Sequence, residues 1–146
     1  PPQFGSLGSL EVLSLRMRQD GGLTGTIPSE LGRLTHLTHL TLSQGSFLDK
    51  NLYQLSGHIP QSLGNLVNLT DLRLDTNQLT GAIPSSFGNL VSLRVLDLSS
   101  NQLAGQIPDS FCKASQELFK RGDCVLGGMN AGPYDASGDQ YTCPLP

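Results

Sequence analysis

Apolar and polar residues alternate in short stretches that recur along the chain. In Leu72-x-Leu74, and again in Leu96-x-Leu98, two leucines flank one polar residue, which is the period-2 pattern of a half-buried strand. We therefore expect one short strand in each recurrence, with its leucines facing the interior. A unit this small cannot bury its leucines alone, so neighbouring units must stack and their strands must pair in parallel.

The dipeptide Ile-Pro sets the period of the recurrence. It occurs four times, at Ile27-Pro28, Ile59-Pro60, Ile83-Pro84 and Ile107-Pro108, which places the prolines 32, 24 and 24 residues apart. The basic unit therefore has 24 residues. Two consecutive copies, beginning at Leu66 and Leu90, match at each position of the pattern L-x-x-L-x-x-L-x-L-x-x-N-x-L-x-G-x-I-P.

The first two copies keep the frame but carry extra residues. Leu15 and Leu23 are 8 residues apart, whereas Leu74 and Leu79 are 5 apart, and Leu42 to Leu55 spans 13. These spacings indicate insertions of three and eight residues, which we assign to 16–22 and 45–54. Because both leave the coil at the equivalent place, the two loops should sit side by side on one edge.

The repeat pattern resembles the plant-type, extracellular leucine-rich repeat of receptor-kinase ectodomains and polygalacturonase-inhibiting proteins, over about residues 1–111. The resemblance implies an α/β-type solenoid, a right-handed superhelix with a parallel β-sheet on its concave face and mostly short strands, turns and 3-10 segments. It also implies a second short strand at Gly-x-Ile-Pro. Glycines are expected to mark turns on the convex side, at Gly32, Gly64 and Gly88.

The resemblance also assigns a structural role to Asn77 and Asn101, which follow the strands. Their amides would satisfy buried backbone groups of adjacent coils in a ladder. Counting back from the next leucine gives Gly21 and Tyr53 in the first two copies. The ladder should therefore be broken or rerouted at the insertions.

The leucine frame stops after Phe111. Of 27 leucines, 24 lie in the first 111 residues, so we divide the chain into a solenoid over 1–111 and a cysteine-containing C-terminal cap over 112–146. One short helix is expected within 109–121, stopped by Gly122. Residue 1 falls at the proline of a preceding Ile-Pro, and we expect the native chain to extend beyond both ends.

The three cysteines, Cys112, Cys124 and Cys143, all lie in the expected cap. An odd number leaves an intermolecular bond, a free thiol or a missing partner open. The end of the chain, Cys143-Pro144-Leu145-Pro146, resembles cap sequences that continue to another cysteine, which fits a missing partner. We favour a disulfide between Cys112 and Cys124. Disulfides form in an oxidising compartment, which predicts an extracellular or secretory location. The glycosylation sequon at Asn68 agrees with this, although such triplets also occur by chance.

The polar positions that flank the strand leucines should be exposed on the concave face. Neighbouring strands lie about 4.8 Å apart, so Arg73 can meet Asp97, and His39 can meet Asp71. Two interpretations remain open, namely surface ion pairs worth about 0–1 kcal/mol and a polar recognition face. The candidate binding residues, which include the large apolar residues of the second insertion, are Arg16, His39, Thr41, Phe47, Leu48, Tyr53, Asp71, Arg73, Asp75 and Asp97.

The second insertion has two interpretations of its own. Its apolar residues lie outside the repeat frame, and an exposed apolar cluster often marks an interaction site. The alternative is that Phe47 and Leu52 fold back and patch the core where the ladder is broken.

Composition and motifs exclude several classes of function. Charged residues make up 14% of the chain and the net charge is -3, so there is no basic face for nucleic acid. No apolar run is long enough to cross a membrane. The chain has no catalytic motif, no C-x-x-C pair and no cofactor or metal motif. Asp71, Asp75 and Asp97 cluster, but an open face lacks the apolar pocket that acid–base catalysis requires.

Three functions are compatible with these residues. The first is a non-enzymatic extracellular module that binds a protein, peptide or glycan through its concave face and insertion edge. The second is a structural or assembly subunit joined through its coil ends. The third is ice binding, which needs a regular array of Thr or Ser. The column of Ser14, Thr41, Arg73 and Asp97 breaks that regularity.

Overall fold

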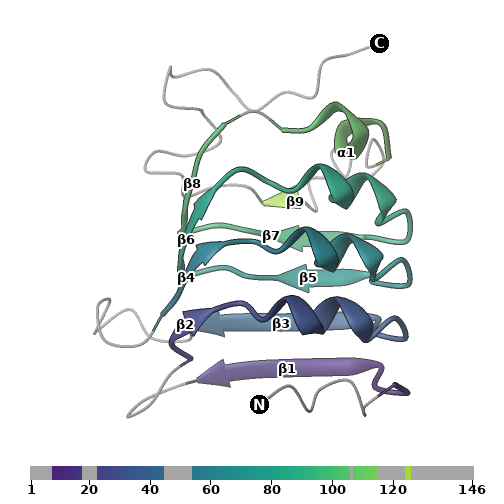
Figure 1. Cartoon of the computed structure of the whole chain (residues 1–146), viewed down its shortest axis with the longest axis horizontal. Coiled ribbons are helices and arrows are strands. Elements are labelled where there is room, and N and C mark those ends of the chain that lie inside the picture. Colours follow the sequence, from purple (N-terminus) through teal and green to yellow (C-terminus); the bar gives the residue numbers. More distant parts are fainter. Residues whose placement is uncertain (1–7, 18–22, 45–53, 106, 115–123, 126–146) are drawn as a thin grey trace.

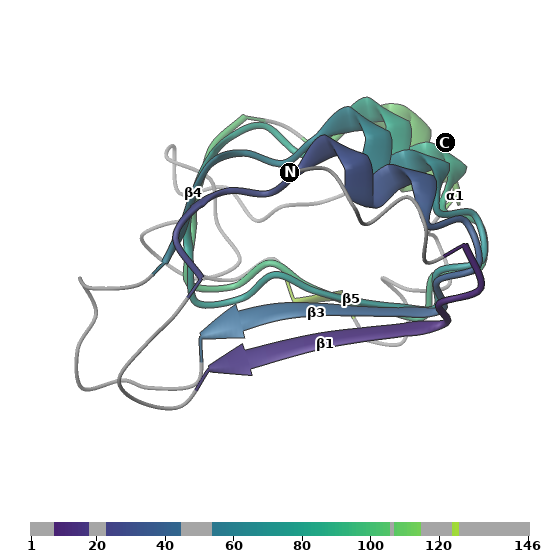
Figure 2. The same ribbon diagram turned by 60° about the horizontal axis from the view of Figure 1, so that its bottom comes forward.

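The structure is a computed structural model that describes residues 8–17, 23–44, 54–105, 107–114 and 124–125. Each copy of the repeat forms one coil, made of a strand, a second short strand and a helix, and the coils stack on one another (Figure 1). Figure 2 shows the coil in cross-section, with one sheet along one face and the helices along the opposite face. The predicted solenoid is confirmed.

Two parallel sheets run the length of the stack. The first sheet has the order β1-β3-β5-β7-β9 and consists of β1 (Val12–Met17), β3 (His39–Gln44), β5 (Asp71–Arg73), β7 (Val95–Asp97) and β9 (Cys124–Val125). The second sheet has the order β2-β4-β6-β8 and consists of β2 (Gly25–Thr26), β4 (Leu55–His58), β6 (Gln78–Gly81) and β8 (Gln102–Leu103). The expected second strand is therefore present in each coil, but it lies earlier than predicted: every one of these strands ends before its Ile-Pro, and β8 ends before Gly105.

The register of the first sheet follows the repeat. Leu40 pairs with Leu13 on one side and with Leu72 on the other, and Leu72 pairs with Leu96. Residues at the same position of successive repeats thus form columns across the sheet. The second sheet is staggered by two residues, since Gly57 pairs with Leu79 rather than with Gly81.

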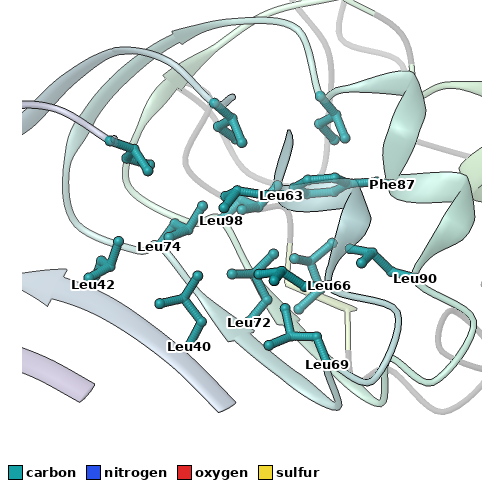
Figure 3. Close-up of a cluster of buried hydrophobic side chains, with 14 of the residues drawn as sticks. Leu40, Leu42, Leu63, Leu66, Leu69, Leu72, Leu74, Phe87, Leu90 and Leu98 are labelled. Carbon is teal, nitrogen blue, oxygen red and sulfur yellow. The ribbon is translucent and has the colours of Figure 1, made fainter. Parts of the chain in front are cut away.

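Leucines fill the space between the first sheet and the helices (Figure 3). Leu40, Leu72 and Leu96 have no exposed surface. The equivalent Leu13 is only partly buried, because its strand, β1, belongs to the first coil of the described stack. Phe87 and Phe111 occupy a position that holds leucine in earlier copies. Their rings meet edge to face, with centroids 6.1 Å apart.

The helices begin directly after the prolines of the Ile-Pro dipeptides. The 3-10 helices η2 (Ser29–Arg33), η3 (Gln61–Asn65) and η4 (Ser85–Asn89) each follow an Ile-Pro, and the fourth copy has an α-helix instead, α1 (Asp109–Ala114). Proline fixes φ near the helical value, and the N–H that it lacks would have no partner in a first turn. The expected continuation of α1 to residue 121 lies outside the described residues.

The convex glycines lie within these helices rather than in separate turns. A Cβ atom added at Gly64 would collide with the backbone oxygen of Ser86 in the next coil, and one at Gly88 would lie 2.7 Å from Cβ of Ser110. Glycine is therefore required because the helices of adjacent coils approach closely, not because of a special backbone angle.

One set of side-chain hydrogen bonds joins the coils in a single direction, from a hydroxyl of each coil to a backbone oxygen of the coil before it. On the strand side, Thr70 Oγ1 donates to Thr38 O at 2.9 Å. On the helix side, three serines donate to the preceding helix: Ser62 to Ser29 O at 2.6 Å, Ser86 to Gln61 O at 2.7 Å and Ser110 to Ser85 O at 2.8 Å. We call this set the coil-to-coil ladder.

The asparagine ladder that the resemblance implied is confirmed. The amide of Asn77 donates to Leu42 O at 2.7 Å, and its Oδ1 accepts from Leu55 N at 3.0 Å. Asn101 repeats both contacts one coil later, with Leu74 O and Leu79 N. The two earlier positions, Gly21 and Tyr53, lie outside the described residues. Leu42 precedes the second insertion and Leu55 follows it. Asn77 therefore connects the two backbone segments on either side of that insertion.

Thr76 and Ser100 directly precede these asparagines and have positive φ values of 57° and 55°. Left-handed backbone destabilises an L-residue by roughly 1–2 kcal/mol, and a β-branched residue is a genuine outlier there. We expect Thr76→Asn to raise the free energy of unfolding by about 0.5–1 kcal/mol, since asparagine tolerates this region. Urea denaturation measures the change, and Thr80→Asn in β6 is the matched control, for which no gain is expected. A loss in Thr76→Asn would contradict the assignment.

Candidate recognition surface

The first sheet places the predicted binding residues in three columns. Val12, His39, Asp71 and Val95 form one column, Ser14, Thr41, Arg73 and Asp97 form the next, and Arg16 pairs with Ser43. The predicted neighbours are therefore correct in register. Because the intervening leucines point inward, the side chains of these columns lie on the opposite side of the sheet from the core.

Arg73 pairs with a residue of its own strand, which differs from the expected pair with Asp97. Its Nε donates to Asp71 Oδ1 at 2.9 Å and its Nη2 to Oδ2 at 3.3 Å. Residues i and i+2 of a strand share a face, so the long guanidinium side chain reaches along β5 as readily as across to β7. The hydrogen bond to Asp71 raises the pKa of Arg73, desolvation opposes this, and the charges of Asp71, Asp97 and Asp75 add to it.

Asp75 and Asp97 are held by hydroxyl groups. Ser43 Oγ donates to Asp75 Oδ1 at 2.5 Å, which links β3 to the segment after β5. Asp97 Oδ1 accepts from Ser99 Oγ at 2.6 Å and from Ser99 N at 3.0 Å. Both carboxylates are half-buried, so their positions are fixed while one side remains open to solvent.

The exposure of the predicted residues varies more than expected. Arg16 and His39 are exposed, and the ring of His39 shares a 2.9 Å hydrogen bond with Thr38 Oγ1 rather than contacting Asp71. Thr41 is only 9% exposed and Ser43 only 5%, so the expectation that these two polar positions are exposed on this face is wrong.

The two coils with insertions have longer strands than their neighbours. β1 and β3 have six residues each and stay paired up to Met17 and Gln44, whereas β5 and β7 have three. β1 and β3 therefore end at paired residues, Met17 and Gln44, and the side-by-side arrangement of the two insertions stays a prediction. Phe47, Leu48 and Tyr53 lie outside the described residues, so their role stays a prediction.

The modification candidates within the described residues are Asn68, Cys112 and Cys124. Asn68 is exposed in the turn between η3 and β5. Cys112 is buried in α1, Cys124 lies in β9 with its backbone paired to Leu96, and Cys143 is outside the described residues. The pairing of Cys112 with Cys124, like the division at residue 111, stays a prediction.

The described part of the chain has no group of three or more His, Cys, Asp or Glu residues that could hold a metal ion. Nor does it contain a helix that is long and apolar enough to cross a membrane.

The coil-to-coil ladder and the Ser43–Asp75 contact were not anticipated from the sequence. A signal for the ladder was present, because serine occurs two residues after the proline at Ser62, Ser86 and Ser110. The Ser43–Asp75 contact also had a signal, because each residue directly follows the second strand leucine of its copy, Leu42 or Leu74.

Comparison with known proteins places residues 48–116 in a family model described as leucine rich repeat. The receptor kinase ectodomain GASSHO1/SCHENGEN3 from Arabidopsis thaliana, solved with CASPARIAN STRIP INTEGRITY FACTOR 2, is 38% identical, with a TM-score of 0.65. That alignment covers 76% of this chain and 12% of the receptor chain. No curated protein matches the chain.

Two similar structures with shorter chains have similar TM-scores. The BIR3–SERK2 complex from Arabidopsis thaliana is 33% identical with a TM-score of 0.63, over 77% of this chain and 55% of that chain. A plant ice-binding protein is 34% identical with a TM-score of 0.63, over 88% of this chain and 35% of that chain. This chain thus spans between 12% and 55% of the length of these three proteins.

Proposed function

The chain is a plant-type leucine-rich repeat protein, and on this basis we propose that it is an extracellular, non-enzymatic recognition module. Its partner is a protein, peptide or glycan that contacts the outer side of the first sheet and the edge where the insertions leave. The observation that carries the proposal is the pair of fixed carboxylates, Asp75 and Asp97, beside the Arg73–Asp71 ion pair. The receptor kinase HAESA, solved with a peptide hormone and a co-receptor, is among the similar structures, which supports a peptide partner.

Charge favours a partner segment that carries lysine or arginine. In the described part of this face, the ion pair of Arg73 neutralises Asp71, whereas Asp75 and Asp97 accept only hydroxyl and backbone donors. A cationic side chain could bind either carboxylate without breaking an existing ion pair. Because both carboxylates are already held in place, binding would lose little conformational entropy.

The test uses a bead-displayed library of synthetic peptides that contain lysine or arginine, with acidic and scrambled peptides as comparison. A hydrogen bond to a charged group contributes about 1.5–3 kcal/mol, so Asp75→Asn with Asp97→Asn should weaken the selected peptides at least about tenfold. Calorimetry at low and high salt measures the change.

A double variant on the helix side, Glu30→Gln with Asp109→Asn, alters net charge equally and should leave affinity unchanged. Equal binding by the wild type and the Asp75/Asp97 variant would overturn this site. An affinity for the selected peptides that is the same at low and high salt would contradict the proposed role of charge.

Assembly through the coil ends is the second candidate. Within the described stack, β1 has a strand neighbour on one side only, and the side chains of Leu10, Leu13 and Leu15 are partly buried rather than fully covered. A second chain that stacked on β1 would cover them. Analytical ultracentrifugation separates the two functions, because assembly predicts a species heavier than one chain that dissociates on dilution.

Ice binding is disfavoured by the charged residues Arg73 and Asp97 in the column that would need Thr or Ser. One similar structure is a plant ice-binding protein, so a thermal hysteresis assay is a direct check, and we expect no hysteresis.

The C-terminal cap and the extracellular location belong to the same proposal. A disulfide from Cys112 to Cys124 would tie α1 to the last strand of the first sheet, since Cys112 is buried and β9 lies beside β7. Peptide mapping without reduction should recover the two cysteines in one linked fragment. Recovery of Cys112 linked to Cys143 instead would refute this pairing.

A further inference from the structure

Thr38 and His39, at the start of β3, share a small hydrogen-bond network with the coil before them. Thr38 Oγ1 lies 3.0 Å from Glu11 O and 2.9 Å from Nδ1 of His39. Both distances are those of hydrogen bonds, but a hydroxyl group carries only one hydrogen. One contact must therefore use that hydrogen, and the other must receive its hydrogen from a different group.

The contact with Glu11 O uses the hydroxyl hydrogen. A carbonyl oxygen has no hydrogen to donate, so the alternative would leave two oxygens 3.0 Å apart with no hydrogen between them. The next coil repeats the contact without a histidine, because Thr70 Oγ1 donates to Thr38 O at 2.9 Å and an aspartate follows Thr70. In both coils the same carbonyl also accepts two backbone N–H groups, at 2.7 and 3.1 Å. The orientation of the hydroxyl therefore belongs to the repeat and does not depend on the imidazole ring.

The ring of His39 then supplies the hydrogen of the second contact. Nδ1 donates to Thr38 Oγ1, and a neutral imidazole has only one N–H, so Nε2 keeps a free lone pair. The side chain of His39 is exposed, and within the described residues its contact with Thr38 is its one side-chain hydrogen bond. Protonation would add a hydrogen at Nε2 and leave the bond to Thr38 in place.

Two strands pack beside His39, and neither brings a free carboxylate opposite it. Asp71 of β5 is the register partner of His39, but Arg73 already binds it. The register partner in β1 is Val12. The titratable groups on these two strands, in the residue before β1 and in the turn before β3 are Glu11, Arg16, His36, Asp71 and Arg73. Nε2 of His39 is therefore an uncharged acceptor beside an ion pair that is already formed.

From this arrangement we infer that His39 is a specificity-determining residue, whose Nε2 accepts a hydrogen bond from an N–H group of the partner. The inference rests on the proposed function and adds a requirement to it. A carboxylate selects for positive charge, whereas a neutral imidazole nitrogen selects for a donor hydrogen and accepts a backbone amide as well as a cation. Thr38 is the positioning residue, because its hydroxyl fixes which ring nitrogen is free.

The place of His39 relative to Asp97 limits where this N–H can lie in the partner. His39 pairs with Asp71, and Asp71 pairs with Val95, two residues before Asp97. Two strand spacings of about 4.8 Å and two residues along a strand put the Cα atoms of His39 and Asp97 about 12 Å apart. An extended peptide covers that distance with about three or four residues. We therefore expect the N–H at that separation from a cation bound at Asp97.

The tautomer is measured by long-range proton–nitrogen NMR of the histidine rings at about pH 8, where an ordinary histidine is neutral. The His39 signals are those lost in His39→Gln. We expect the hydrogen on Nδ1 in the wild type, and Thr38→Val should remove this preference. Thr70→Val deletes the equivalent hydroxyl of the next coil and should leave the ring unchanged. A wild-type ring with its hydrogen on Nε2 would overturn the inference.

The binding test uses the peptides selected from the bead library, chosen without histidine and with an acetylated N-terminus. A net hydrogen bond contributes about 0.5–1.5 kcal/mol, so His39→Leu should weaken binding about three- to tenfold. N-methylation of the amide about three or four residues from the cation should cost the wild type the same factor and His39→Leu nothing more. If replacing a lysine by norleucine behaves this way instead, the cation itself is the donor.

A change of pH gives a readout that a purely structural role of His39 would not show. Lowering the pH from about 8 to about 5 protonates histidine, so Nε2 loses its acceptor lone pair and the face gains a positive charge. Binding to the wild type should weaken over this range. His39→Gln should reduce the dependence, whereas His36→Gln, in the turn before β3, should keep it.

The outcomes separate this inference from the proposed function. Equal affinity of the wild type and His39→Leu, together with a loss in the Asp75/Asp97 variant, would overturn the role of His39 and leave the carboxylate site standing. A library that yields no peptide bound by the wild type would overturn the proposed peptide partner, and this inference with it.

Discussion

Replacing Phe87 with alanine should lower the free energy of unfolding by about 3–5 kcal/mol, the usual effect of removing a fully buried phenylalanine. The side chain has no exposed surface, and its ring packs against Phe111 of α1. The cavity would lie between η4 and α1, where the stack of 3-10 helices changes to an α-helix. Urea denaturation followed by far-UV circular dichroism measures the loss.

Phe87→Leu is the matched control, because Leu31 and Leu63 occupy the same position in two earlier coils. We expect a loss of about 1 kcal/mol for this variant, since leucine fits the repeat but leaves Phe111 without its ring partner. Equal losses in the alanine and leucine variants would show that the aromatic contact, and not the filled volume, stabilises this site.

Asn77→Ala should lower the free energy of unfolding by about 3 kcal/mol. The substitution leaves Leu55 N and Leu42 O without the side-chain partner that they have in the wild type, and a buried group left unsatisfied costs about 1–3 kcal/mol. Hydrogen exchange provides a local readout, because the amide of Leu55 should exchange much faster in the variant than in the wild type.

The same substitution at Asn89, which is exposed on η4, controls for the loss of an amide at the surface. Its effect should stay within about 0.5 kcal/mol. If Asn77→Ala were equally mild, water would have to replace the ladder contacts, and the asparagine would not hold the second insertion coil together.

The repeat frame could be predicted from the sequence because each leucine recurs where the same backbone position recurs. The two copies that start at Leu66 and Leu90 have equal length, so equivalent residues in them can be matched one by one. These matched residues are the ones that pair between β5 and β7. The asparagine ladder followed in the same way. Periodicity therefore predicts the backbone and the core.

The chemistry of the exposed face was harder to predict, because several partners lie within reach of one side chain. Arg73 has Asp71 two residues back in its own strand and Asp97 in the next strand, both on one face, and spacing alone does not choose between them. Thr41 is buried although it occupies the same repeat position as Ser14, which is exposed, so the place in the repeat alone does not set exposure. The extra pairing at the ends of β1 and β3 depends on insertions that the repeat does not specify.

The direction of the coil-to-coil ladder has a consequence for synthesis on the ribosome. In each of its contacts, a hydroxyl such as that of Thr70 or Ser86 donates to a backbone oxygen of the coil that is synthesised before it. A newly synthesised coil can therefore donate to the coil before it, but its own backbone oxygens have no donor until the next coil is made. The next 24 residues take about 1–5 s to be made at typical elongation rates. During that interval one coil at the growing end lacks these donors, and it is the part of the nascent chain where a chaperone would bind.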